Sequence, residues 1–331
     1  MGGCQHRGAE SALHLDTACW WSLKPDLLAG RSGGRRAVIR RPPLGELLPK
    51  AHDMGREFTV IKALGPTDVP VPVAYGYCED PSVTGAHFYV MSEVSGQAFY
   101  TTEDVEAGLS MDARVTLSNS FMDTLAALHA LDPVAIGLGD LGRHDGYVSR
   151  QLRTWYGSWE ASKEAAKYDD DRIHDLHRML LSTLPEQGPP RVVHGDFGTH
   201  NVMVGSDGVI TAVLDWEIAT LGDPMADFAY ALNAWVDEDD DREFAPFAAT
   251  AAPGFLRRSA LVERYSSITG CDVSQLDYYR SFNYFKTACI LHGVYARYLM
   301  GQKSTEGVDM EGLYNRMRGS IELAIAQARD L

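Results

Sequence analysis

The sequence predicts an α+β fold with a small, β-rich N-terminal part and a larger, mainly helical C-terminal part. Two observations carry this prediction. Short apolar or β-branched runs within residues 37–94 surround a single helical pattern, whereas apolar residues recur mainly at helical spacing after residue 101. At 331 residues the chain is long enough to bury a substantial core in each part.

The N-terminal part is expected to consist of strands around one helix. Residues 37–40 are apolar up to a final cation, Arg40, and predict a strand. A helix is predicted from about Ala51 to Leu64, because its apolar residues recur at helical spacing. Prolines then end this helix, and the runs at 73–78 and 87–94 predict two further strands.

Three helical patterns dominate the C-terminal part. The first is an apolar stripe made by Leu117, Phe121, Leu125 and Leu128. Long helices are also predicted over 278–300 and 310–328. Lys286 and Arg297 fall in the first of these long helices, where they could contact an anionic substrate or form a solvated, salt-bridged face.

The most specific feature is the run His194-Gly195-Asp196-Phe197-Gly198-Thr199-His200-Asn201, followed by Leu214-Asp215-Trp216-Glu217. Short apolar strands at 191–193 and 202–204 flank the first run. Gly205-Ser206-Asp207-Gly208 predicts a hairpin turn, and a return strand at 209–214 carries Asp215 at its end. Asp196 and Asp215 are therefore expected to lie close together.

Two carboxylates and an amide in this order suit phosphoryl transfer from a nucleotide. Asp196 can orient an attacking hydroxyl and accept its proton, while the Asn201 oxygen and the Asp215 carboxylate can hold Mg²⁺ against the nucleotide phosphates. A lone H-x-D tripeptide arises easily by chance. The ordered combination is far more restrictive and indicates a kinase-type site.

Residues 192–232, which include Gly222-Asp223-Pro224-Met225-Ala226-Asp227-Phe228-Ala229-Tyr230, resemble the aminoglycoside phosphotransferase and choline kinase family. Within it, they are most similar to kinase-like proteins and domains associated with acyl-CoA dehydrogenases. The resemblance implies a two-lobed protein-kinase-like fold. Residues 1–94 would form the nucleotide-binding N-lobe, 95–100 the hinge, and 101–331 the C-lobe with the catalytic loop and the substrate-binding helices.

The resemblance also implies roles for residues of the C-lobe. Asp196 would be the catalytic base, Asn201 a Mg²⁺ ligand and Asp215 the bridging Mg²⁺ ligand. Asp227 would brace the catalytic loop from beneath. Glu217 would either orient metal-bound water or be a solvated or N-capping acid.

In the N-lobe, the resemblance assigns nucleotide contacts to four residues. Arg40 takes the position of the lysine that contacts the α- and β-phosphates, and Glu57 that of the acid which pairs with it. Glu93 and Val94 lie at the expected hinge, where backbone groups would meet the adenine edge.

Two departures from the pattern have consequences. Protein kinases carry a lysine two positions after the catalytic aspartate, and Gly198 stands there instead, which argues against a protein substrate. The glycine-containing loop that covers the phosphates is not recognisable in residues 1–27. Gly30-Arg31-Ser32-Gly33-Gly34 is expected to be a turn before the Arg40 strand.

Composition narrows the class of partner. A formal net charge of −15 disfavours nucleic acid, because the general field repels phosphate backbones. No apolar run is long enough to predict a membrane span. The 5 cysteines form no CxxC pair, so a cytoplasmic protein is expected. The acidic run 237–241 would suit a cationic substrate or be a solvated loop.

These features together predict a Mg²⁺-dependent phosphotransferase that moves the γ-phosphate of ATP or GTP to a hydroxyl of a small molecule. One alternative is a catalytically weak or inactive nucleotide-binding pseudokinase with a regulatory role. Another is a metal-dependent hydrolase, which would release phosphate without an acceptor. The sequence leaves open the acceptor, the choice between ATP and GTP, and the oligomeric state.

Overall fold

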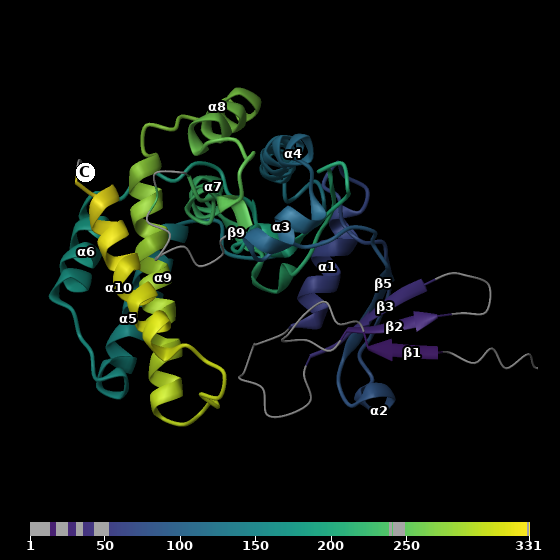
Figure 1. Cartoon of the computed structure of the whole chain (residues 1–331), viewed down its shortest axis with the longest axis horizontal. Coiled ribbons are helices and arrows are strands. Elements are labelled where there is room, and N and C mark those ends of the chain that lie inside the picture. Colours follow the sequence, from purple (N-terminus) through teal and green to yellow (C-terminus); the bar gives the residue numbers. More distant parts are fainter. Residues whose placement is uncertain are drawn as a thin grey trace, which may run out of the picture.

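The computed structural model describes residues 14–17, 26–30, 36–42, 53–237, 240, 249–329 and 331. They form a small lobe around a sheet and a larger lobe built mainly of helices (Figure 1). This arrangement confirms the predicted α+β architecture. Within these ranges, none of the helices has both the length and the apolar character that a membrane crossing requires.

The small lobe is a five-stranded antiparallel sheet with the strand order β1-β2-β3-β5-β4. Its strands are β1 (His14–Thr17), β2 (Asp26–Gly30), β3 (Arg36–Arg40), β4 (Ala74–Cys78) and β5 (Phe88–Ser92). The sequence analysis predicts the last three but not β1 and β2. Gly30 pairs with Arg36, and the turn expected at 30–34 lies, apart from Gly30, outside the described residues.

Helix α1 (Met54–Leu64) packs against β4 and β5 of this sheet. The Asp53 side chain caps it by accepting a hydrogen bond from the Arg56 backbone N–H (3.0 Å). Its buried face contains Met54, Val60, Ile61 and Leu64, together with one carboxylate, Glu57. A charged group on an apolar face needs a buried partner, and Arg40 is the partner of Glu57.

The segment after β5 joins the small lobe to the large one. Gln97 exchanges backbone hydrogen bonds of 2.9 and 3.0 Å with Val204 of the large lobe. Gly96 allows this close approach, since its φ is +132° and a Cβ there would lie 2.7 Å from the Val204 carbonyl oxygen. The two lobes are therefore tied together by backbone contacts at this point.

The large lobe contains eight α-helices and two short strand pairs among its described residues. The pairs are β6 (Arg191–Val193) with β9 (Thr220–Gly222), and β7 (Val202–Val204) with β8 (Ile210–Val213). The helices are α3 (Thr102–Gly108), α4 (Met111–Ala130), α5 (Tyr147–Ala166), α6 (Asp171–Ser182), α7 (Pro224–Asn233), α8 (Arg258–Thr269), α9 (Leu276–Leu299) and α10 (Met310–Gln327). In the small lobe, Pro81–Thr84 forms the short helix α2.

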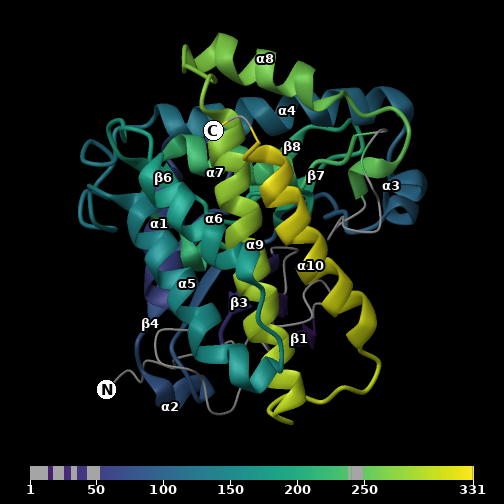
Figure 2. The same cartoon turned by 90° about the vertical axis from the view of Figure 1, so that its left-hand side faces the viewer.

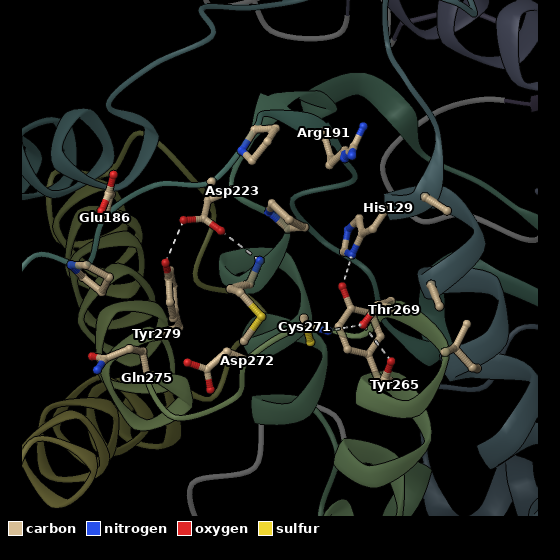
Figure 3. Close-up of a pocket in the computed structure, with 18 of the residues that line it drawn as sticks. His129, Glu186, Arg191, Asp223, Tyr265, Thr269, Cys271, Asp272, Gln275 and Tyr279 are labelled. Carbon is tan, nitrogen blue, oxygen red and sulfur yellow. Dashed lines mark hydrogen bonds between the residues drawn. The ribbon is translucent and has the colours of Figure 1, made fainter.

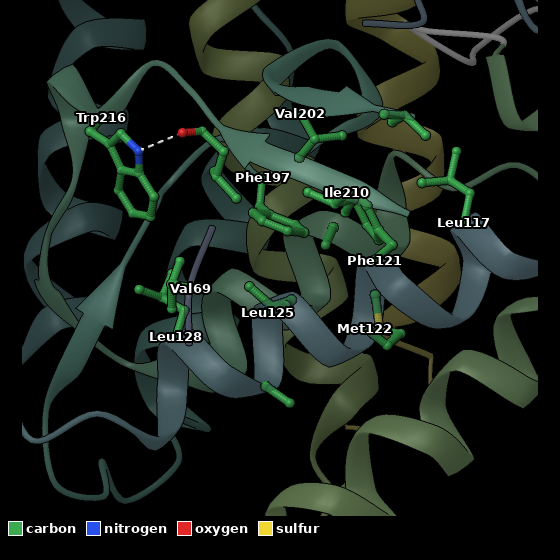
Figure 4. Close-up of a cluster of buried hydrophobic side chains, with 14 of the residues drawn as sticks. Val69, Leu117, Phe121, Met122, Leu125, Leu128, Phe197, Val202, Ile210 and Trp216 are labelled. Atoms are coloured by element: carbon green, nitrogen blue, oxygen red, sulfur yellow. Dashed lines mark hydrogen bonds between the residues drawn. The ribbon is translucent and has the colours of Figure 1, made fainter. Parts of the chain in front are cut away.

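Two buried clusters support the large lobe. In the first, the predicted stripe of α4 packs beneath the β7–β8 hairpin, and the rings of Phe121 and Phe197 lie 4.6 Å apart (Figure 4). In the second, α9 lies beside α10 (Figure 2) and packs on α5. Trp159, Phe282 and Phe285 are buried in this cluster. Because Phe197 follows Asp196, the first cluster anchors the loop that carries this carboxylate.

Candidate active site

The loop between β6 and β7 is clamped by Asp227 on α7. Its carboxylate accepts hydrogen bonds from the backbone N–H groups of His194 (2.7 Å) and Gly195 (2.8 Å). His129 Nε2 lies 3.2 Å from the same carboxylate. Burial alone would raise the pKa of Asp227, but His129, His194 and the Gly195 N–H lower it. An ionised brace therefore lies where the resemblance implied one.

His194 connects this loop to the one after β8. Its Nδ1 accepts a hydrogen bond from the Asp196 backbone N–H (3.2 Å), so the proton is on Nε2, which lies 2.9 Å from the Leu214 carbonyl oxygen. The Leu214 backbone N–H in turn donates to the Asn201 carbonyl oxygen (2.9 Å). Asp215 and Asn201 are thus brought together although they come from different strands.

Asp196 is held by side chains on both of its oxygens. Tyr230 donates its hydroxyl to Oδ1, and Asn201 donates its amide to Oδ2 (3.0 Å). His200 Nε2 lies 3.5 Å from Oδ2. Burial would raise the pKa of Asp196, but the hydrogen bond and charge of His200, together with Tyr230 and His194, lower it to about 2. The carboxylate is therefore ionised throughout the neutral pH range.

Asn201 and Asp215 present the oxygen ligands that Mg²⁺ prefers. The amide nitrogen of Asn201 is bound to Asp196, and among the described residues no hydrogen bond reaches its amide oxygen. Asp215 has a φ of 64°, a left-handed conformation that costs a non-glycine residue about 1 kcal/mol or more. These residues fit a Mg²⁺ site, because hard oxygen donors from two loops meet there.

Arg40 links the small lobe to this site. Its Nε donates to Glu57 (2.9 Å) and its Nη2 donates to Asp215 (2.9 Å). The side chains of Arg40 and Glu57 are 2% and 1% exposed, whereas that of Asp215 is 18% exposed. Truncating one partner of such a buried ion pair costs about 3–5 kcal/mol. The predicted Arg40–Glu57 pair is therefore present, and it extends to Asp215.

The other predicted residues take more peripheral positions. Glu93 follows β5, is exposed, and lies 3.3 Å from Arg36, while Val94 is half-buried. Glu217 is half-buried and lines a pocket of about 480 Å³ with Asp53 and Arg56.

Part of the acidic run 237–241 forms salt bridges within the protein. Arg258 lies 3.3 Å from Asp237 and 2.5 Å from Asp240. The remaining members of the run, 238, 239 and 241, lie outside the described residues. Two of its carboxylates are thus already paired with a cation.

Sequence analysis assigned no role to three residues around Asp196. Tyr230 lies on α7 three positions after Asp227, so both face the catalytic loop, and this spacing was a signal that could have been used. His200 belongs to the motif itself, but its approach to Asp196 depends on the turn at Thr199–Asn201. The Tyr100 ring lies 6.4 Å from the His200 ring, and burial together with the charges of Asp215 and Asp104 raises the pKa of Tyr100.

A pocket of about 850 Å³ is lined by residues that include His129, Asp223 and Tyr265 (Figure 3). Its lining includes none of Arg40, Glu57, Asp196, Asn201 and Asp215. Its polar groups bind one another: Tyr279 donates to Asp223 (2.8 Å), and His129 Nδ1 is 2.7 Å from the Tyr265 hydroxyl (Figure 3). This network supports the Asp227 brace, and the pocket is not the candidate active site.

Comparison with known proteins identifies the family of this chain. Residues 27–261 match the phosphotransferase enzyme family. Acyl-CoA dehydrogenase family member 11 of Gallus gallus is 35% identical over 83% of this chain and 36% of its own length. Member 10 of Mus musculus is 32% identical over 85% of this chain and 26% of its own length. The chain thus spans only about a third or less of these curated relatives.

Solved structures agree in fold. A proposed aminoglycoside phosphotransferase from Ralstonia eutropha JMP134 has a TM-score of 0.82 and 29% identity, covering 98% of this chain and 94% of that one. The GDP complex of aminoglycoside 2'-phosphotransferase-IIIa has a TM-score of 0.59 and 15% identity, covering 98% and 95%. The predicted protein-kinase-like fold is confirmed, and the chain belongs to the phosphotransferase enzyme family.

Proposed function

We propose that the protein is a Mg²⁺-dependent phosphotransferase that moves the γ-phosphate of ATP or GTP to a hydroxyl of a small molecule. The observation that carries this proposal is the convergence of Asp196, Asn201 and Asp215, with Arg40 reaching them from the other lobe. These groups match, in type and placement, what phosphoryl transfer between two bound substrates requires.

The nucleotide would lie between the lobes. Arg40 is fixed by Glu57 and would donate to the nucleotide phosphates, for which a planar guanidinium is well suited. Backbone groups of Glu93 and Val94 would contact the edge of the base. Structural neighbours include complexes with ADP and with GDP, so their folds accommodate either base.

Asn201 and Asp215 would hold Mg²⁺ through the Asn201 amide oxygen and the Asp215 carboxylate. A bound Mg²⁺ supplies electrostatic stabilisation by neutralising charge on the β- and γ-phosphate oxygens. Arg40 shares the Asp215 carboxylate (2.9 Å), so the residues alone already hold this loop in place.

Asp196 would orient the acceptor. A carboxylate with a pKa of about 2 is a weak base, so it first binds the acceptor hydroxyl as a hydrogen-bond acceptor. It takes the proton only as the acceptor oxygen bonds to phosphorus. Tyr230 and Asn201 fix both carboxylate oxygens, which directs the remaining lone pairs.

The alternative, a catalytically weak nucleotide-binding module, is favoured by one feature of the small lobe. Strands β1 and β2 form an antiparallel hairpin, and the sequence that connects them, Ala18-Cys19-Trp20-Trp21-Ser22-Leu23-Lys24-Pro25, contains no glycine. Backbone N–H groups approach phosphates most closely in glycine-containing loops. A connecting sequence without glycine is consistent with weak phosphate binding.

A transfer assay separates these functions. The purified protein is incubated with Mg²⁺, γ-labelled ATP or GTP, and pools of hydroxylated compounds that include amino sugars, choline-like amines and hydroxyacyl compounds. The last class enters because the curated relatives are named acyl-CoA dehydrogenases. Label transfer that is lost in Asp196→Asn but kept in the exposed control Asp68→Asn supports the proposal.

Other outcomes count against it. Nucleotide binding without transfer to any pool favours the weak module. Phosphate release at the same rate with and without an acceptor favours a metal-dependent hydrolase.

A further inference from the structure

Lys286 on α9 carries a buried ammonium group beside the catalytic loop. The residue is 8% exposed, and its Nζ lies 3.4 Å from the Gly195 carbonyl oxygen and 5.2 Å from the centroid of the Tyr230 ring. Gly195 immediately precedes Asp196, and Tyr230 donates its hydroxyl to Asp196. The ammonium therefore belongs to the immediate surroundings of this carboxylate.

This ammonium has few partners for a buried charge. It has three N–H donors, but among the described residues its single hydrogen-bond acceptor is the Gly195 oxygen, at the long distance of 3.4 Å. No carboxylate oxygen of those residues lies within the salt-bridge distance of 4.0 Å of it. Burial lowers the pKa of Lys286, and the nearby charges of Asp196 and Asp227 raise it. A structural role would be served better by an apolar side chain, so the charge indicates a ligand.

The catalytic loop itself has no room for an equivalent cation. A Cβ on Gly198 would lie 2.5 Å from the His200 ring, so a longer side chain at position 198 would displace His200 from Asp196. Lys286 reaches the same surroundings from α9, more than eighty residues later in the sequence. The sequence also allowed Lys286 to lie on a solvated or salt-bridged face, and its burial excludes a solvated position.

We infer that Lys286 binds the phosphoryl group during its transfer. This inference rests on the proposed function. In the transfer step, the bond between the γ-phosphorus and the oxygen bridging to the β-phosphate breaks, and a bond to the acceptor oxygen forms. The acceptor proton passes to Asp196, and Lys286 keeps its own protons. The ammonium donates to the phosphoryl oxygens, which carry the charge in the transition state.

The test compares wild type, Lys286→Met and Lys286→Arg in their binding of Mg²⁺–ADP with and without aluminium fluoride, a mimic of the transferring phosphoryl group. Lys286→Met is expected to bind Mg²⁺–ADP like wild type. Its affinity for the fluoride complex should fall by about 100-fold, as for loss of one donor to a transition state. Lys286→Arg should recover part of it. Lys303→Met, at an exposed lysine, is the matched control.

Thermal unfolding shows whether the role is merely structural. Lys286→Met removes a poorly paired buried charge and keeps the length of the side chain, so its melting temperature should equal or exceed that of wild type. A fall in melting temperature that accounts for the loss of fluoride-complex binding overturns the inference. So does equal binding of the fluoride complex by wild type and Lys286→Met.

Two further outcomes are distinguishable. If acceptor-free nucleotide hydrolysis is unchanged in Lys286→Met and only the KM of the acceptor rises, the ammonium binds the acceptor and the inference is wrong. If wild type itself binds no Mg²⁺–ADP, the proposed function fails and the inference fails with it.

Discussion

The Asp227 brace can be tested by Asp227→Asn, which replaces one carboxylate oxygen with an amide NH₂ group. The carboxylate accepts backbone N–H bonds of 2.7 and 2.8 Å from His194 and Gly195, and His129 lies 3.2 Å away. Asparagine keeps one acceptor oxygen and places an NH₂ group opposite a backbone donor. One charge-assisted hydrogen bond, worth about 1.5–3 kcal/mol, is lost. A buried donor without an acceptor adds about 1–3 kcal/mol.

The expected loss of stability is therefore about 2.5–6 kcal/mol, and the melting temperature should fall by roughly 4–9 °C. Urea unfolding measures the free energy of unfolding, and titration calorimetry measures the affinity of the site for Mg²⁺–nucleotide. Nucleotide affinity should change less than transfer activity, because Asp227 binds the backbone just before Asp196, whereas Arg40 is held by Glu57. A change in stability below about 0.5 kcal/mol would refute the view that Asp227 clamps this loop.

Three further predictions concern the rest of the site. The pKa of Asp196 is depressed to about 2, so its contribution to stability is fully present above the unfolded-state pKa of about 4 and is lost as the pH falls toward 2. In urea unfolding, the stability difference between wild type and Asp196→Asn should therefore shrink between these two pH values. A difference that stays constant would contradict the assignment. Arg40→Lys should weaken Mg²⁺–nucleotide binding by about tenfold or more, since one ammonium group cannot replace the two bonds to Glu57 and Asp215. A wild-type affinity of Arg40→Lys in titration calorimetry would disprove this. Gly96→Ala should lower the free energy of unfolding by about 1–3 kcal/mol, because Gly96 has a φ of +132° and a Cβ there would clash with Val204. Unchanged stability in urea unfolding would show that the backbone at this link between the lobes can shift to accept the Cβ.

The catalytic loop could be predicted because its chemistry is local in sequence. Asp196 and Asn201 lie on one turn, and a short hairpin brings Asp215 back to them, so the motif already contains the geometry. The Arg40–Glu57 pair followed from the resemblance, whereas its extension to Asp215 did not. That contact joins the two lobes, and no spacing in the sequence encodes it.

Other features of the fold and the site could not be predicted, and most of them depend on how helices that are distant in the sequence pack together. Lys286 looks like any lysine on an amphipathic helix until α9 is placed against α7. Strands β1 and β2 were missed because the Trp-rich segment between them matches no expected pattern. The acidic run suggested a cation site, but Arg258 from α8 already pairs with Asp237 and Asp240.

The central claim is that Asp215 and Asn201 form a metal-dependent nucleotide site. Titration calorimetry with ATP and GTP, with and without Mg²⁺, tests it most directly in wild type, Asp215→Ala and the control Asp68→Ala. We expect Mg²⁺-dependent binding of at least one nucleotide in wild type and the control, and its loss in Asp215→Ala. Mg²⁺–nucleotide affinity that is unchanged in Asp215→Ala would contradict the account.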